Sequence, residues 1–148
     1  MGNNPFVYYR INSLEDLKRD SSREVCGLDW HGDLEVIRRF YARFTDVPFS
    51  HDDSDRTVGN PMAILTDGGI VSFAVPFFFH EGETEIGGVA TVPERRNEGL
   101  CKALISEMAF RILEQGKTAT LTTEKDNYPM RAAAEAIGMK ETGRGIPE

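Results

Sequence analysis

The stretch Glu85–Ile105, EIGGVATVPERRNEGLCKALI, decides how the chain folds. Its first part is apolar and contains glycine, which is typical of a buried strand. A short loop with two arginines follows at residues 93–99, and a helical pattern begins directly after it. When a strand is followed by a short loop and then by the start of a helix, several free backbone N–H groups point to the same place. The stretch therefore predicts a binding site for a phosphorylated ligand.

The length and the charge limit the class of protein. A chain of 148 residues fits a single domain, residues 1–148, that buries roughly 68–70% of its unfolded surface. The formal net charge of -7 disfavours binding to nucleic-acid phosphates, so no nucleic-acid partner is expected. The same charge mildly favours a cationic substrate, although a solvated acidic surface is the commoner explanation.

Nothing in the sequence points to a membrane, to export or to a metal. No apolar run approaches the length needed to span a bilayer, and no apolar signal segment stands at the N-terminus. We therefore expect a cytoplasmic protein in which Cys26 and Cys101 are reduced. His31, His51 and His80 have no metal-like spacing with the cysteines.

The rest of the sequence alternates between strand and helix patterns. Strands are predicted at 6–11, 62–65, 70–79, from 83 onward, at 118–123 and at 139–142, with a hairpin turn at 66–69. Helices are predicted after Ser13, where Leu14 and Leu17 face inward, after Asp33, from about Asn97 to Gln115, and at 129–137. Residues 45–60 are predicted to form a long polar loop, and Pro76 indicates a bulge or an edge position.

This order of elements predicts an α/β protein with a mixed sheet. The strand–helix–strand unit from Glu83 to Thr123 is expected to be parallel and right-handed. Ligands of such sheets bind beyond the carboxyl ends of the strands, and the loop at 93–99 lies there. The fold class and the loop chemistry therefore indicate the same site.

Two motifs of the sequence resemble those of the GNAT N-acetyltransferase superfamily. The segment RNEGLC, Arg96–Cys101, resembles the superfamily's Gln/Arg-x-x-Gly-x-Gly/Ala signature, and the preceding GGVATVPE resembles its fourth strand. Asn127 and the helix after it, which ends in IGM, resemble the second motif of that superfamily. The element order over residues 6–142 matches as well. The resemblance implies a GNAT-like mixed central sheet flanked by helices.

The resemblance also implies acetyl-CoA as co-substrate and assigns residues to its parts. In the superfamily, backbone N–H groups of the loop and helix start hold the pyrophosphate, and glycine lets the backbone approach closely. Val89 and Thr91 would offer backbone partners to the pantetheine arm, and Asn127 would hydrogen-bond it near the thioester. The pyrophosphate residues would be Arg96, Asn97, Glu98, Gly99, Leu100 and Cys101.

Some positions depart from the pattern of the superfamily. Asn97 stands where glycine is common, and Cys101 replaces the usual glycine or alanine. Ala134 occupies the position of the frequent tyrosine, the acid that protonates the departing thiolate. Too few residues follow Gly138 for the two long closing strands of many relatives. We therefore expect a shortened C-terminal end, with an acceptor pocket that is open or completed by a second subunit in a homodimer.

The resemblance and the chemistry together predict an N-acetyltransferase. It would move an acetyl group from acetyl-CoA to a primary amine of a small molecule or a protein by direct attack. Glu85 is the first candidate for the general base, because it begins the strand that runs along the cofactor. An exposed glutamate at a strand end is the competing explanation. The alternative function is a non-catalytic acyl-CoA-binding or regulatory module of the same fold, which Ala134 favours.

Overall fold

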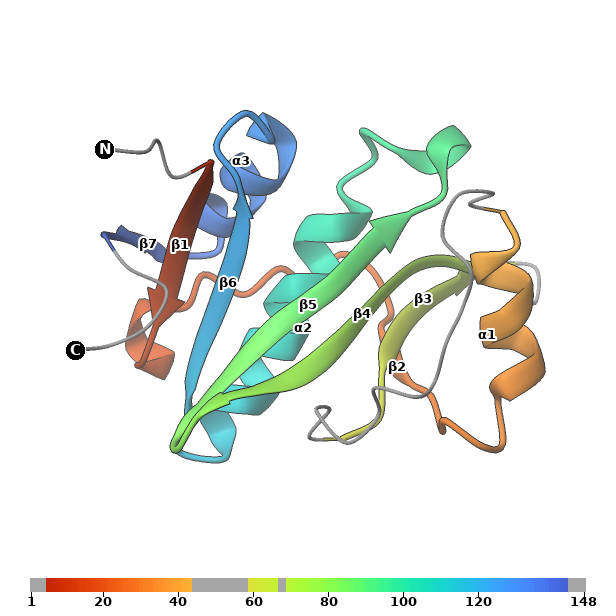
Figure 1. Cartoon of the computed structure of the whole chain (residues 1–148), viewed down its shortest axis with the longest axis horizontal. Coiled ribbons are helices and arrows are strands. Elements are labelled where there is room, and N and C mark those ends of the chain that lie inside the picture. The colour runs from red at the N-terminus through yellow and green to blue at the C-terminus, as the bar shows by residue number, and fades with distance from the viewer. Residues whose placement is uncertain (1–4, 44–58, 67–68, 144–148) are drawn as a thin grey trace.

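A computed structural model describes residues 5–43, 59–66 and 69–143, and Figure 1 shows their arrangement. The strands form one seven-stranded sheet in the order β2-β3-β4-β5-β6-β1-β7. The strands are β1 Phe6–Ile11, β2 Cys26–Gly27, β3 Met62–Thr66, β4 Gly69–His80, β5 Glu83–Thr91, β6 Thr118–Glu124 and β7 Lys140–Thr142. The helices are α1 Leu34–Tyr41, α2 Leu100–Glu114 and α3 Tyr128–Ala136, with 3₁₀ helices at Leu14–Asp16 and Pro93–Arg95.

Helices cover the two faces of the sheet unequally. On β4, the ring of Phe73 lies 5.5 Å from that of Phe40 and 5.6 Å from that of Tyr41, so α1 packs on this face. The neighbouring side chains of β4 point to the opposite face, where the buried side of α2 packs against the sheet. Figure 1 shows α2 behind the central strands. The core residues of α2 include Leu100, Leu104, Met108 and Ile112, as their spacing predicts.

The central strands separate from one another at the end that carries the 93–99 loop. The strands β5 and β6 are parallel, as predicted, but they pair only over Glu83–Glu85 and Thr118–Thr120. Beyond these residues Figure 1 shows the two strands diverging. On its other side, β5 pairs with β4, and between the pairs Val75–Gly87 and Phe73–Ala90 it has one residue more than β4. This extra residue forms a β-bulge, in which Gly88 has a φ of +58°. The bulge turns the carboxyl half of β5 away from β6 and leaves its edge on that side unpaired.

The N-terminal strand completes the sheet on the other side of β6. β1 is antiparallel to β6 over all six residues of Phe6–Ile11, and β7 in turn pairs with β1. The place beside β6 is thus filled by β1 of the same chain. The buried Tyr9 fastens β1, since its hydroxyl donates to Glu135 of α3 at 2.8 Å and accepts from Arg131 at 3.2 Å.

Some local predictions are wrong, for reasons visible in the backbone. The helix predicted from Asn97 begins at Leu100, because Asn97 and Gly99 adopt left-handed conformations that a helix excludes. Leu14 does not face inward and is 47% exposed, since the segment after Ser13 forms only a 3₁₀ turn. Most of the loop predicted at 45–60 lies outside the described residues.

Other predictions are confirmed. Pro76 lies beyond Ala74, the last residue of β4 that pairs with β3, and therefore occupies an edge position on that side. Asp33 precedes α1 as expected, but its carboxylate accepts from the Asp29 N–H at 2.8 Å instead of capping the helix. Asn127 caps α3 through a hydrogen bond from the Met130 N–H.

Replacement of Gly138 tests the packing of the α3 terminus. Its φ of +102° costs a residue with a Cβ roughly 1–2 kcal/mol, and the Cβ would overlap the carbonyl oxygen of Asp16. Gly138→Ala is expected to lower the free energy of unfolding by roughly 2–5 kcal/mol in urea titrations. Gly116→Ala is the control, because its φ is +79° but its Cβ would meet nothing within 4 Å. Equal losses in the two variants would contradict the packing explanation.

Candidate functional site

The loop between β5 and α2 is folded by its own main chain. The Val92 N–H donates to Val71 of β4 at 2.9 Å, which holds the start of the loop against the sheet. A 3₁₀ turn follows, in which the Arg96 N–H donates to Pro93 at 3.3 Å. The left-handed Asn97 and Gly99 then reverse the chain into the first turn of α2. Asparagine and glycine are the residues that adopt this conformation most readily.

Six consecutive backbone N–H groups in this loop have no hydrogen-bond partner in the described part of the chain. They belong to Asn97, Glu98, Gly99, Leu100, Cys101 and Lys102. The first intrahelical bond of α2 is donated by Ala103, to Gly99 at 3.2 Å. The unpaired amides at a helix start carry the positive end of its dipole, so they form a site for an anion. Arg96 differs from the prediction, because its own amide is already bonded to Pro93.

Two arginines add positive charge to this site. Arg96 donates from Nε to the Thr91 carbonyl at 3.2 Å, and Arg23 donates to the Glu98 carbonyl at 2.9 Å. Neither guanidinium has a carboxylate within 4.0 Å among the described residues. The other cations of the loop are compensated, Arg95 by Glu98 at 2.9 Å and Lys102 by Asp20 at 3.6 Å. An incoming phosphate therefore meets two uncompensated guanidinium groups.

The predicted pantetheine residues lie along the unpaired edge of β5. Val89 falls in the bulge, between the paired residues Gly87 and Ala90. The side chain of Thr91 is engaged by the Ser72 hydroxyl at 2.9 Å, so only its main chain is available. The unpaired edge offers N–H and C=O groups to an extended ligand in the manner of an added strand. The roles of Val89 and Thr91 stay predictions.

Asn127 has a structural role that the sequence also predicts. Its Oδ1 accepts from the Met130 N–H at 3.3 Å, and its Nδ2 donates to the Thr123 hydroxyl at 3.0 Å. These bonds tie the start of α3 to the end of β6, the strand that faces the gap. One amide hydrogen of Asn127 remains for a ligand, and its contact with pantetheine stays a prediction.

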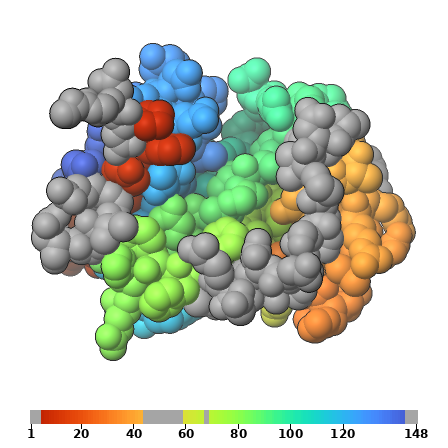
Figure 2. All heavy atoms as spheres, viewed as in Figure 1, coloured from red at the N-terminus to blue at the C-terminus, as the bar shows by residue number. Residues whose placement is uncertain are grey.

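Glu85 lies on the face of the sheet opposite to α2. Its Oε1 accepts a hydrogen bond of 2.5 Å from the hydroxyl of Thr120 on β6. Among the described residues Glu85 has no cationic partner. Figure 2 shows this face, where atoms of β1, β5 and β6 reach the surface. Glu85 is thus a carboxylate that is oriented by a neighbour and has no cation beside it among the described residues.

Arg10 is a functional candidate that sequence reasoning did not find, and its partner is Glu83 of β5. Arg10 of β1 donates to Glu83 at 2.8 Å across β6, and Arg10 pairs in register with Thr120. The second carboxylate oxygen of Glu83 is buried without a partner among the described residues. Thr120, Glu85, Glu83 and Arg10 therefore form one polar row. The only sequence signal was the polar alternation at 118–123, because the position of β1 beside β6 is non-local.

Three side chains bear on the departing thiolate and on the route of transfer. Ala134 is fully buried in α3 and has no acidic proton to give, while Tyr128 at the start of this helix is 68% exposed. Burial raises the pKa of the Cys101 thiol to about 11, and its Sγ lies 3.7 Å from the sulfur of Met130. Cys101 is therefore a neutral thiol, which is a poor nucleophile.

The described residues contain neither a group of three or more metal-ligating side chains nor a helix long and apolar enough to cross a membrane.

Comparisons with known proteins agree with this geometry. A model of the family described as FR47-like protein matches residues 68–144, which is more than half of the chain. No curated protein matches the sequence significantly.

Solved structures share the fold at low sequence identity. A GNAT-family acetyltransferase from Colwellia psychrerythraea is 14% identical with a TM-score of 0.73, over 93% of this chain and 52% of its own. The ribosomal-protein-S18-alanine N-acetyltransferase from Escherichia coli is 20% identical with a TM-score of 0.64, over 80% and 78%. An aminoglycoside N-acetyltransferase in complex with CoA is 19% identical with a TM-score of 0.63, over 84% and 97%. This chain also spans only 60% of a GNAT-family structure from Novosphingobium aromaticivorans.

The raised pKa of Cys101 predicts slow alkylation. A rise from 9.0 to about 11 lowers the thiolate fraction at pH 8 about a hundredfold. Iodoacetamide at pH 8 is expected to label Cys101 of the native protein at least about tenfold more slowly than in urea, and the rate should climb as the pH approaches 11. Peptide mass spectrometry measures the rate. Labelling of the native protein at the rate found in urea would contradict the burial of this thiol.

Proposed function

The chain belongs to the FR47-like protein family, which is of GNAT type, and on this premise we propose that it is an N-acetyltransferase. It transfers the acetyl group of acetyl-CoA to a primary amine by direct attack. The observation that carries the proposal is the row of six unpartnered amides, Asn97–Lys102, beside the unpaired edge of β5. A diphosphate needs such donors, and an acyl-pantetheine arm needs such an edge.

The residues present fit the parts of acetyl-CoA. The amides of Asn97–Lys102 would hold the diphosphate, with Arg96 and Arg23 compensating its charge. The main chain from Val89 to Thr91 would bind the pantetheine arm, which brings the thioester toward Glu85 at the closed end of the gap. When bound, the co-substrate supplies an acetyl group activated as a thioester.

Glu85 is proposed as the general base. A primary amine has a pKa near 10.4, so at neutral pH it must lose a proton before its nitrogen can attack the thioester carbon. Thr120 orients the Glu85 carboxylate, and Arg10 compensates Glu83 two residues away. Glu85 is therefore the uncompensated carboxylate of the polar row, available to take that proton. An N–H in the bulge at Val89 would donate to the oxygen that becomes negative during attack.

The departing thiolate does not require a tyrosine at position 134. A thiol with a pKa of about 8.5 forms its thiolate at pH 7 at a cost of only about 2 kcal/mol. Proton transfer from a positioned acid typically gives about 10²–10⁴-fold in rate, so Ala134 is expected to slow the reaction without abolishing it. In this proposal, water protonates the departing thiolate.

The acceptor is proposed to be a cationic amine. Glu85 is an uncompensated carboxylate on β5, and the chain carries a net charge of -7. Both features attract an ammonium group to the face where attack must occur. The acceptor belongs to a small molecule or to an exposed amine of a protein.

An assay of CoA-thiol release from acetyl-CoA with a panel of amines tests this function. We expect turnover with at least one cationic amine. Glu85→Gln is expected to lower kcat/KM about 10²–10⁴-fold at pH 7, and less at high pH, where the amine loses its proton unaided. CoA affinity should not change. Glu114→Gln is the control, because it removes the same charge at an exposed position of α2.

The alternative, a non-catalytic acyl-CoA-binding module, rests on Ala134. CoA binding without turnover of any amine, unaffected by Glu85→Gln, would favour that module and contradict the proposed enzyme. If Glu114→Gln lost as much activity as Glu85→Gln, the assignment of Glu85 as the general base would be contradicted. The proposed acetyltransferase activity itself would not be.

A further inference from the structure

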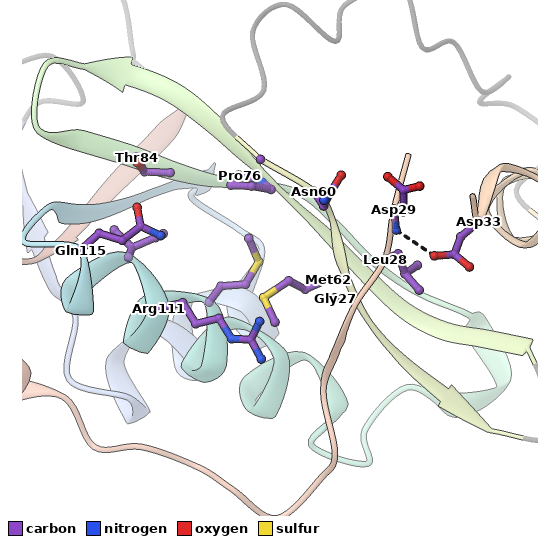
Figure 3. A pocket seen from close by; sticks show the side chains of 13 residues that line it. Gly27, Leu28, Asp29, Asp33, Asn60, Met62, Pro76, Thr84, Arg111 and Gln115 are labelled. Atoms are coloured by element: carbon purple, nitrogen blue, oxygen red, sulfur yellow. Dashed lines mark hydrogen bonds between the residues drawn. The ribbon is translucent and has the colours of Figure 1, made fainter. Parts of the chain in front are cut away.

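A cavity of about 510 Å³ lies on the α2 face of the sheet, at the carboxyl end of that helix (Figure 3). Its volume falls within the range of about 300–1,000 Å³ that is usual for small-molecule sites. Thr84 lines it and is the neighbour of Glu85 in β5, but alternate side chains of a strand point to opposite faces. The sheet therefore separates this cavity from the polar row.

The cavity is also remote from the amide loop along α2. The amides lie at the start of this helix, whereas the cavity is lined by Met108, Arg111, Ile112 and Gln115 near its end. At about 1.5 Å of rise per residue, even the nearest residues of the two sites, Lys102 and Met108, lie about 9 Å apart along α2. A ligand of the cavity is thus distinct from the coenzyme and from the acceptor amine.

The floor of the cavity is apolar but also carries a hydroxyl. Met62, Pro76, Met108 and Ile112 supply apolar surface. Thr84, which is only 3% exposed, adds the hydroxyl of its side chain to this lining. The floor therefore suits a molecule with an apolar body and at least one polar group.

One end of the cavity is positive. Arg111 extends from α2 toward β2, where a Cβ built on Gly27 would lie 3.9 Å from its Nη1. Its Nε donates to Glu107 at 2.9 Å, but Arg19 also binds that carboxylate, at 2.6 Å. Two guanidinium groups share one negative charge, so a net positive charge remains and the terminal nitrogens of Arg111 are available to a carboxylate.

The other end of the cavity is negative. Asp29 and Asp33 lie beyond Met62, on the side away from Arg111 (Figure 3). Each uses one oxygen locally, since Asp33 accepts from the Asp29 N–H at 2.8 Å and Asp29 accepts from the Gly32 N–H at 2.7 Å. The second oxygen of each carboxylate is left for an ammonium group. Opposite charges at the two ends of an apolar floor complement a dipolar ligand.

We propose that this cavity binds a zwitterion with an apolar body, an amino acid or dipeptide, as a second site beside the catalytic one. Its carboxylate pairs with Arg111, its ammonium group lies at Asp29 and Asp33, and its side chain covers Met62 and Met108.

Calorimetry on the whole protein tests the site with L-phenylalanine and leucyl-leucine as probes. At least one is expected to bind at concentrations up to about 10 mM, and to bind at least about tenfold more tightly than phenethylamine or 3-phenylpropanoate, which each lack one charge. Failure of both probes to bind the folded protein, or equal binding of the singly charged analogues, would overturn the proposal.

Two variants locate the binding. Arg111→Gln and Asp33→Asn are each expected to weaken the probe at least about tenfold, and Asp33→Asn keeps an oxygen for the Asp29 N–H. Lys117→Gln is the matched control, because it removes one positive charge at an exposed position just after α2 that does not line the cavity. CoA titration of each variant reports its folding. Unchanged probe binding in folded Arg111→Gln, or an equal loss in Lys117→Gln, would overturn the assignment.

Discussion

The parting of β5 from β6 is the constraint on which the rest of the structure depends. The two strands pair over only three residues each, and the bulge at Gly88 turns the continuation of β5 aside. If β5 and β6 were paired along their whole length, the hydrogen-bonding groups on that edge of β5 would be occupied by β6. The start of α2 would then lie elsewhere. With the strands apart, β5 keeps an unsatisfied edge that leads directly to the amides at Asn97–Lys102. The site for a phosphate and the site for an extended ligand along the edge of β5 are therefore continuous.

The other side of the gap is built by a strand from the opposite end of the sequence. β1 covers β6, is fastened to α3 through the buried Tyr9 and brings Arg10 to the polar row. Arg10 compensates Glu83 and leaves Glu85 as the free carboxylate, oriented by Thr120. The charge pattern that the proposed chemistry needs therefore depends on the topology of the sheet as much as on the identity of the base.

Local patterns explain what could be predicted from the sequence. The buried positions of α2 recur every four residues, and Gly99 marks a left-handed turn, so the helix and its loop were predictable. The start of the helix was placed three residues too early, because a helical pattern does not reveal the left-handed Asn97. The pair of Arg10 with Glu83 was missed, since it depends on which strands become neighbours, and no local pattern encodes that. The cavity beside Arg111 depends in the same way on segments that are distant in the sequence.

Backbone amide NMR with CoA tests the central claim most directly. If the amides of Asn97–Lys102 bind the diphosphate, their proton resonances will move downfield on titration with CoA, as expected for donors that gain a charged acceptor. Pantetheine, which lacks the phosphates, will leave those resonances in place. Saturation of the protein with CoA while these six amides stay unshifted would contradict the account.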